Sequence, residues 1–290
     1  MTSEGQQRPI TDTQVTDSDL SEQIKAVTKD SHVRAENTEL MRSYVKGQVT
    51  LSQYKMLLCS LYEIYKALEE EMDHNASHPA VAPVYFPVEL ARLECLEKDL
   101  EHFYGPDWRN KIVVPAATLN YTQRLREIGE KHPEYLVAHA YTRYLGDLSG
   151  GQVLGRITQK SLGLKSNDGL SFFYFPGVSS PNRFKQLYRG RMNSIELSSE
   201  ERAGLLQEAV RAFQLNIQVF DDIQKTLSIV ELGAESSWTH EKPIQQQQQH
   251  LVHGEKPVQI SSSFLSASPL LRMMLGVCVA LAVGMGMYAI

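Results

Sequence analysis

The stretch that most constrains the fold is Tyr141–Gln152, which lies inside a longer proline-free segment with apolar residues at helical spacing. Three glycines occur in this stretch, and each costs about 1 kcal/mol relative to alanine in a helix interior. Gly146 and Gly150 are four residues apart, so they share one face of the predicted helix. A face without Cβ atoms lets another group approach the backbone closely, and Asp147 places a carboxylate beside it. The alternatives are a contact with another helix or a plain kink.

The rest of the chain also favours helices. Few alternating β-branched runs occur, whereas long stretches show helical spacing. After a first helix capped by Asp17 or Ser18, we predict helices over residues 38–46, 52–75, 88–104, 118–131, 136–161, 182–194 and from 198 to about 229. Of the 290 residues, 42% are hydrophobic, which is enough for a substantial core. The predicted fold class is therefore all-α, with a single helical domain.

Four segments of different character divide the chain. Residues 1–17 are polar and predicted to be disordered, and residues 18–229 form the helical domain. Residues 230–268 contain a run of glutamines amid Ser, His, Glu and Lys, which is typical of a disordered, solvated linker. Residues 269–290 end in an uncharged apolar run that begins at Met273. As a helix this run would span about 27 Å, so it is predicted to be a C-terminal transmembrane tail anchor.

Charge and cysteine content narrow the class of function. The net charge is −5 without a basic block, so no nucleic-acid partner is expected. The polar N-terminus does not have the apolar core of a signal peptide, and the three cysteines show no metal-binding spacing.

Arg272 flanks the anchor on the side that the positive-inside rule assigns to the cytosol. We expect a cytosolic domain on a thin membrane such as the endoplasmic reticulum, with the anchor a candidate for self-association.

The first helix carries a histidine beside its predicted packed face. That packed stripe is predicted to be Leu20, Ile24, Val27 and Ser31. His32 falls roughly a quarter-turn to one side of it, near Lys25 and Glu36. A lone histidine is more often a surface residue than a ligand, but Glu36 one turn later is placed to orient an imidazole.

A histidine on one helix and a glycine face on another favour a planar ligand held between them. Haem fits this pattern, because one helix would supply an imidazole ligand and the other would lie against the opposite face of the ring. The two propionates of haem require cations, for which Lys25, Lys185 and Arg189 are candidates. Lys185 and Arg189 are four residues apart and share a helix face, although a solvated basic face is an equally good explanation.

Five segments, in the same order along the chain, resemble the haem oxygenase family. They are residues 28–37, 60–65, 82–87, 138–152 and 184–194. The resemblance covers about Leu20 to Ile223 and the anchor, and it is strongest to the inducible form of vertebrates. It implies that haem is sandwiched between a proximal helix and a kinked distal helix.

The resemblance also implies roles for individual residues. His32 matches the axial iron ligand, and Glu36 matches the carboxylate that supports it. Gly146 and Gly150 match glycines that lie over the ring, and Asp147 matches the distal carboxylate that orders water near bound oxygen. The residues matched to the distal network are Tyr65 and Arg143, those near the propionates are Lys25, Tyr141, Lys185 and Arg189, and those of the pocket on the last helix are Phe213 and Asn216.

The reaction implied by the resemblance is the oxidative cleavage of haem b, which is both cofactor and substrate. It uses O₂ and opens a meso carbon to give biliverdin, ferrous iron and carbon monoxide. Electrons must come from outside, because the chain has no flavin or Rossmann motif, and the family's donor is NADPH–cytochrome P450 reductase. Biliverdin reductase is the expected partner for product removal. A haem carrier without enzymatic activity and a tail-anchored helical scaffold remain the alternatives.

Overall fold

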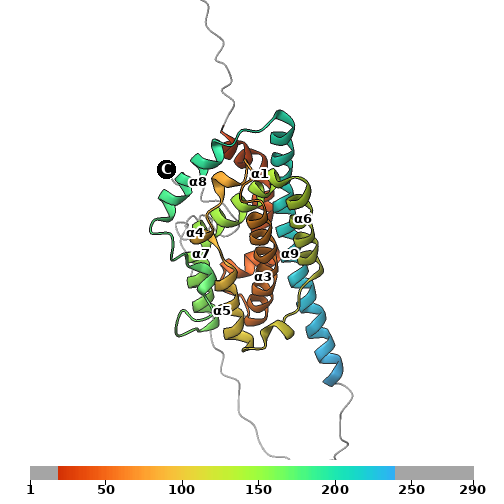
Figure 1. The fold of residues 1–290 in the computed structure, drawn as a ribbon. Helices are drawn as coiled ribbons and strands as arrows, with labels where there is room; N and C mark the ends of the chain where they lie inside the picture. Colours follow the sequence, from red (N-terminus) through yellow and green to blue (C-terminus); the bar gives the residue numbers. More distant parts are fainter. Residues whose placement is uncertain (1–18, 239–290) are drawn as a thin grey trace, which may run out of the picture.

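The computed structural model describes residues 19–238, with side chains to residue 229, and every regular element in this part is helical (Figure 1). The α-helices are α1 (Leu20–Glu36), α2 (Glu39–Val45), α3 (Leu51–His74), α4 (Pro87–Leu90), α5 (Leu93–Tyr104), α6 (Ala116–Lys131), α7 (Leu136–Leu162), α8 (Pro181–Asn193) and α9 (Ser199–Trp238). Short 3₁₀ helices are η1 (Ala82–Val84), η2 (Trp108–Asn110), η3 (Pro133–Tyr135) and η4 (Ser171–Phe173). The all-α prediction is confirmed for this part of the chain.

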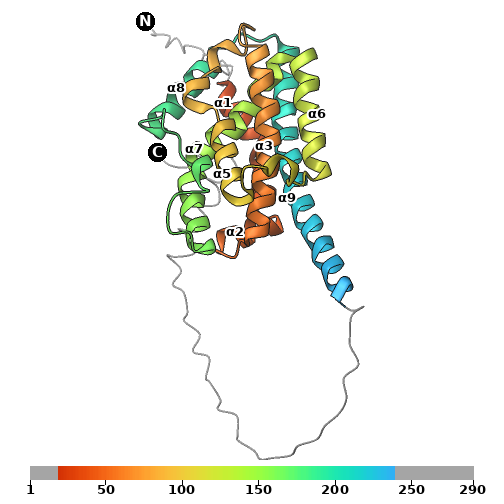
Figure 2. The same ribbon diagram turned by 60° about the horizontal axis from the view of Figure 1, so that its bottom comes forward.

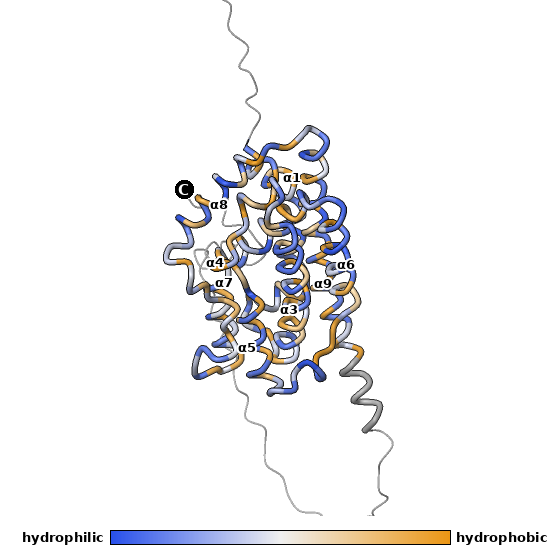
Figure 3. Tube along the Cα trace, in the orientation of Figure 1, coloured by the Kyte–Doolittle hydropathy of each residue, from blue (hydrophilic) through white to orange (hydrophobic). Residues whose placement is uncertain are grey.

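Two long helices, α3 and α9, organise the packing. Helix α3 packs against α5, α6, α7 and α9, whereas α9 packs against α1, α2, α3, α6 and α7. Helix α1 and helix α7 both pack on α8 and α9 but are not a closely packed pair themselves. Apolar and polar residues alternate along the helices (Figure 3), as amphipathic helices around a shared core require.

The last helix is longer than predicted. It continues past Ile229 to Trp238, into the segment predicted as linker, and its end projects from the rest of the bundle (Figure 2). Residues 230–238 contain no proline and include Glu, Leu and Ala, which are good helix formers. The predicted segment 1–17, the rest of the predicted linker and the predicted anchor 269–290 lie outside the described residues. Among residues 19–238, none of the helices combines the length and the apolar composition that crossing a bilayer requires.

Local capping explains where α3 begins. The Thr50 hydroxyl accepts a hydrogen bond from the backbone N–H of Gln53 at 3.1 Å, and the Gln53 side chain accepts one from the Thr50 N–H at 2.8 Å. This reciprocal pair is a capping box, and it satisfies two donors that a helix start otherwise leaves unpaired. Helix α3 therefore starts at Leu51, one residue before its predicted start.

A single helix predicted over residues 88–104 is in fact two. Helix α4 ends at Leu90, and α5 starts at Leu93. The reason is a tertiary cap, because the Glu69 carboxylate of α3 accepts hydrogen bonds from the backbone N–H groups of Arg92 and Leu93 at 2.5 and 3.3 Å. A carboxylate at a helix N-terminus is favoured by the helix dipole, so Glu69 stabilises a new helix start at this point.

The packed face of α1 differs from the predicted one. Val27 is 42% exposed, so its assignment to the stripe was wrong, whereas Thr28 and His32 are buried. The buried side chains of this helix are Leu20, Ser21, Ile24, Thr28, Ser31, His32 and Ala35. Thr28 can be buried because its hydroxyl donates to the carbonyl oxygen of Ile24 at 2.7 Å, which removes the cost of an unpaired polar group.

Candidate active site

The histidine of α1 lies in a buried setting with an acidic neighbour. His32 is 8% exposed, and its Nδ1 lies 3.3 Å from Oε1 of Glu36. The contact is close but does not meet hydrogen-bond geometry, since Glu36 Oε1 is buried without a hydrogen-bond partner among the described residues. Burial raises the pKa of Glu36 to about 7. Because Nδ1 faces the carboxylate, Nε2 is the imidazole nitrogen that would ligate a metal.

Helix α9 supplies the aromatic neighbour of this histidine. The ring of Phe213 meets the His32 ring edge-on, with 5.9 Å between their centroids. Phe213 is almost completely buried, so it fixes one side of the imidazole by packing. The structure therefore brings together three of the predicted site residues, His32, Glu36 and Phe213.

A second group of predicted residues meets around Asp147 on α7. Tyr65 of α3 donates a hydrogen bond to Oδ2 of Asp147, and Nη2 of Arg143 lies 3.4 Å from the same oxygen. All three side chains are buried. Burial raises the pKa of Asp147, and the charge of Arg143 and the hydrogen bond from Tyr65 oppose that rise. The site thus holds a carboxyl group that is desolvated yet has two donors on one oxygen.

A chain of hydrogen bonds continues from Arg143 through the core. Nη1 of Arg143 donates to Oδ1 of Asn216 at 2.7 Å, and Nδ2 of Asn216 lies 3.5 Å from the Tyr121 hydroxyl. That hydroxyl is 3.0 Å from Nδ1 of His139, whose Nε2 is 3.0 Å from Oε1 of Glu208. The chain links α6, α7 and α9 through five buried polar side chains.

The charge states of Glu208 and His139 determine which group donates and which accepts in each hydrogen bond of this chain. Burial alone would raise the pKa of Glu208, but hydrogen bonds from His139 and Arg124 lower it to about 2, so Glu208 is an acceptor only. Burial lowers the pKa of His139, so the imidazole is neutral and its Nε2 must donate to Glu208. Its Nδ1 then accepts from Tyr121, which leaves the phenol oxygen to accept from Asn216. Glu208 therefore orients the groups that hold Arg143 at Asp147.

Two of the predicted cations, Lys185 and Arg189, lie against α7 between Tyr141 and Ser149. Nζ of Lys185 on α8 donates to the Ser149 hydroxyl of α7 at 3.0 Å. Burial, and then the charge of Arg189, lower the pKa of Lys185. Burial raises the pKa of Tyr141, against the charge and hydrogen bond of Arg189. Tyr141, Lys185 and Arg189 thus form one cluster of α7 and α8 side chains.

Lys25 of α1 lies toward the same cluster. Its Nζ is 3.6 Å from Oε2 of Glu22, and the negative charge of Glu22 contributes to the raised pKa of Tyr141. The first turns of α1 therefore face the cluster of Tyr141, Lys185 and Arg189. This is where the sequence predicts that the haem propionates bind.

The buried glycines of α7 lie on two different faces of the helix. Gly146, Gly150, Gly151 and Gly155 are all buried, but Gly151 and Gly155 pack against Phe173. A close packing contact, one of the alternatives for a glycine-rich helix, is thus the role of this second pair. Helix α7 is continuous from Leu136 to Leu162, and the kink expected in it remains a prediction.

Comparison with known proteins decides the family. Residues 18–222 match the family model described as Heme oxygenase. The chain belongs to the haem oxygenase family. It is 62% identical to the heme oxygenase of Takifugu rubripes, over 94% of this chain and 95% of that one. It is 54% identical to heme oxygenase 1 of Homo sapiens, over 72% of this chain and 73% of that one.

Solved structures agree with this assignment. Heme oxygenase-1 of the cyanobacterium Synechocystis sp. PCC6803, determined in complex with heme, superposes with a TM-score of 0.70 at 37% identity. The match covers 76% of this chain and 99% of that one. The heme oxygenase of Leptospira interrogans gives a TM-score of 0.68, also at 37% identity, over 70% of this chain and 98% of that one. This haem oxygenase is therefore an enzyme that degrades haem.

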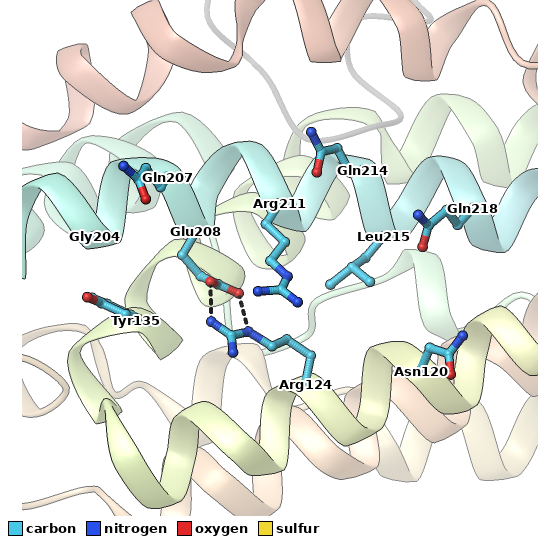
Figure 4. Close-up of a pocket in the computed structure, with 10 residues that line it drawn as sticks. All are labelled: Asn120, Arg124, Tyr135, Gly204, Gln207, Glu208, Arg211, Gln214, Leu215 and Gln218. Atoms are coloured by element: carbon cyan, nitrogen blue, oxygen red, sulfur yellow. Dashed lines mark hydrogen bonds and ion pairs between the residues drawn. The ribbon is translucent and has the colours of Figure 1, made fainter.

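Three members of the hydrogen-bond chain of this haem oxygenase were missed at the level of sequence, namely Tyr121, His139 and Glu208. Only His139 lies within a matched segment, and the other two carry no motif. Glu208 and its partner Arg124 border a polar groove of about 670 Å³ between α6 and α9 (Figure 4). None of the residues that line this groove is a predicted site residue, so the groove is separate from the site.

The Glu208–Arg124 pair leads to a prediction for acid stability. Arg124 binds both oxygens of Glu208, at 3.0 and 2.6 Å. The pKa of Glu208 falls from 4.5 to about 2 on folding, so its contribution is present above pH 4.5 and is lost as the pH falls toward 2. A shift of this size corresponds to about 3 kcal/mol. We expect Glu208→Gln to lower the free energy of unfolding at pH 7 by about this amount and to flatten its dependence on pH below 4.5.

Urea unfolding of the two proteins between pH 7 and pH 3 measures this difference. The matched control is Glu127→Gln, because Glu127 also pairs with Arg124, at 2.9 Å, but is exposed. A pH dependence of Glu208→Gln that equals that of the unsubstituted protein would contradict the prediction.

Proposed function

We propose that this chain cleaves haem b oxidatively at a meso carbon, producing biliverdin, ferrous iron and carbon monoxide. It would use O₂ and electrons from NADPH–cytochrome P450 reductase. The observation that carries the proposal is the pairing of a buried imidazole, His32 on α1, with a buried carboxyl group, Asp147 on α7, in a chain of this family. The first group suits iron ligation and the second suits proton transfer.

The residues present fit haem. Nε of Arg143 is buried without a hydrogen-bond partner among the described residues, so a polar partner is expected beside Asp147. Since α1 and α7 do not pack closely on each other, a flat ligand between them displaces no helix–helix interface.

Haem would supply the iron that activates O₂ and the ring carbon that is oxidised. His32 would hold the iron through Nε2, while Glu36 faces Nδ1 and orients the ring. Lys185 and Arg189, with Lys25 and the Tyr141 hydroxyl, would bind the propionates, because charge-assisted hydrogen bonds are the strongest available at such an edge. Gly146 and Gly150 would allow the α7 backbone to approach the ring, since no Cβ lies in the way.

Asp147 would hold and deliver the proton that oxygen chemistry requires. Its raised pKa brings the carboxyl closer to the operating pH, where a general acid–base group is most effective. Tyr65 and Arg143 share Oδ2 of Asp147, so Oδ1 is the oxygen that would exchange a proton with water. The chain that ends at Glu208 keeps Arg143 in this position, so the proton donor does not need to reorganise during turnover.

We further infer that residues 269–290 anchor the enzyme in the endoplasmic reticulum membrane, with the helical domain in the cytosol. The uncharged run from Met273 and the flanking Arg272 support this inference. A membrane-bound reductase would then meet the enzyme at raised effective concentration. Biliverdin reductase would remove the product, and the anchor is a candidate for self-association.

The test is a reconstituted reaction with the full-length chain in detergent micelles, haemin, the reductase and NADPH. We expect the haem absorption to be replaced by that of biliverdin, with one carbon monoxide captured for each haem lost. Haem binding without bile pigment would identify a carrier. Failure to bind haem would favour a helical scaffold.

A further inference from the structure

Helix α5 and its N-cap residue, Arg92, hold the segment Ser171–Tyr174 with two buried charged side chains. Oδ1 and Oδ2 of Asp99 accept hydrogen bonds from the backbone N–H groups of Ser171 and Phe172, both at 2.8 Å. Nη1 of Arg92 donates to the carbonyl oxygens of Phe172 and Tyr174, at 3.3 and 2.6 Å. Asp99 and Arg92 are both almost completely buried. We call these two residues and their four backbone bonds the α5 clamp.

The clamped segment presses one aromatic residue against α7. A Cβ atom at Gly155 would lie 3.2 to 3.3 Å from Cβ and ring atoms of Phe173, and one at Gly151 would lie 3.2 Å from the Phe173 carbonyl oxygen. On its other side the Phe173 ring stacks on Tyr54 of α3, with 6.2 Å between centroids and 14° between planes. Phe173 is therefore wedged between α3 and the glycines of α7, with little room to move.

This contact lies behind the predicted haem face of α7. At 100° per residue, the mean direction of Gly151 and Gly155 is about 140° from that of Gly146 and Gly150. The two glycine pairs thus lie on nearly opposite sides of one helix. Phe173 supports the side of α7 that faces away from Gly146 and Gly150, and it sets how far α7 can retreat.

We propose that Asp99 and Arg92 are positioning residues for haem oxidation, because they fix the Ser171–Tyr174 segment as a support that determines how closely α7 approaches the ring. The proposal rests on the proposed function for the identity of that ring. Asp99 forms none of its hydrogen bonds with a predicted site residue and acts through Phe173 and α7, whereas the charge of Arg92 also acts directly on Asp147, by opposing the rise that burial causes in its pKa. The clamp holds the segment by main-chain hydrogen bonds, and the segment contacts α7 through Phe173, so loosening the clamp would loosen this support of α7.

Asparagine at position 99 tests the clamp with little change in shape. The carboxylate accepts from two N–H groups, but an amide offers one oxygen and directs its NH₂ at the other donor. One bond is therefore lost and replaced by a donor–donor contact. The matched control is Asp222→Asn, because Oδ2 of Asp222 accepts from the Ala117 N–H at 2.9 Å, at the start of α6 and away from the α5 clamp.

Amide hydrogen exchange of the full-length chain without haem gives the first readout. We expect Asp99→Asn to speed exchange in residues 146–155 roughly tenfold and to leave α1 and α6 unchanged, whereas Asp222→Asn leaves residues 146–155 unchanged. Unchanged exchange in residues 146–155 would overturn the proposal, and so would an equal rise in every helix. This readout does not involve haem, so it stands even if the proposed function fails.

The second readout is the position at which haem is opened. We expect Asp99→Asn, and Gly155→Ala from the opposite side of the same contact, to broaden the mixture of biliverdin isomers while haem affinity changes less than about threefold. Asp222→Asn should give the same mixture of biliverdin isomers as the unsubstituted protein, even if it lowers stability as much as Asp99→Asn does. An unchanged pattern in both Asp99→Asn and Gly155→Ala would show that the clamp supports the fold alone and would overturn the positioning role.

Discussion

His32→Ala is expected to lower haem turnover by more than about a hundredfold. Loss of a residue that merely supports a metal ligand costs about 10- to 100-fold, and His32 is the predicted ligand itself. Its Nδ1 faces Glu36 at 3.3 Å, and no other histidine of α1 could replace it. Haem titration followed by absorption spectroscopy should show that the variant lacks the spectrum of an imidazole-ligated haem. Biliverdin formation should be lost as well.

The fold of this variant should survive with a moderate penalty. His32 is buried and packs against Phe213, so truncation leaves a small cavity that costs about 1–3 kcal/mol. Urea unfolding of the haem-free protein measures this cost. Ser31→Ala is the control, because Ser31 is also buried on α1 but is no candidate ligand, and its turnover should be unchanged. An imidazole-type haem spectrum in His32→Ala would show that another residue binds the iron.

The chemistry of the site could be predicted where it depends on spacing within one helix. His32 and Glu36 are one turn apart, as are Arg143 and Asp147, and the structure places both pairs in contact. An (i, i+4) relation is a property of the helix alone. Once a segment is correctly assigned as helical, such pairs follow without knowledge of the tertiary structure.

Contacts between helices could not be predicted in the same way. The Tyr121–His139–Glu208 chain joins α6, α7 and α9, and periodicity does not specify how three helices are rotated against each other. The break before α5 has a similar origin, because Glu69 on α3 supplies the cap. Neither carboxylate lies in a motif, and each acquires its role only through packing.

The buried face of α1 shows that hydrophobicity alone does not determine which residues of a helix are buried. Valine is more apolar than threonine, so the sequence favours Val27 over Thr28 as a residue of the packed stripe. In the helix the Thr28 hydroxyl bonds to the carbonyl oxygen one turn back, and its methyl group can then be buried at little cost. His32 lies one turn after Thr28 on this same face, which is why it is more buried than the sequence predicts.

Asp147→Asn is expected to reduce turnover by about 10² to 10⁴, the usual contribution of a general acid–base group, while haem still binds. The amide oxygen can accept from Tyr65 and Arg143 as the carboxylate does, so the shape of the site is retained. What is lost is the exchangeable proton. The measurements are the rate of biliverdin formation at saturating haem and the haem dissociation constant, which should change little because His32 is untouched.

The pH profile separates a proton-transfer role from a purely electrostatic one. Burial raises the pKa of Asp147, so the turnover of the unsubstituted enzyme should change at a pH higher than the usual pKa of an aspartate. Asp147→Asn should remove this pH dependence. Tyr65→Phe is the companion variant, because it deletes the donor to Oδ2 while keeping the ring and the carboxyl group. If Tyr65→Phe were as impaired as Asp147→Asn, the phenol would be the group that moves the proton. Normal turnover in Asp147→Asn would leave the carboxyl group with a structural role, as the anion that neutralises the buried Arg143.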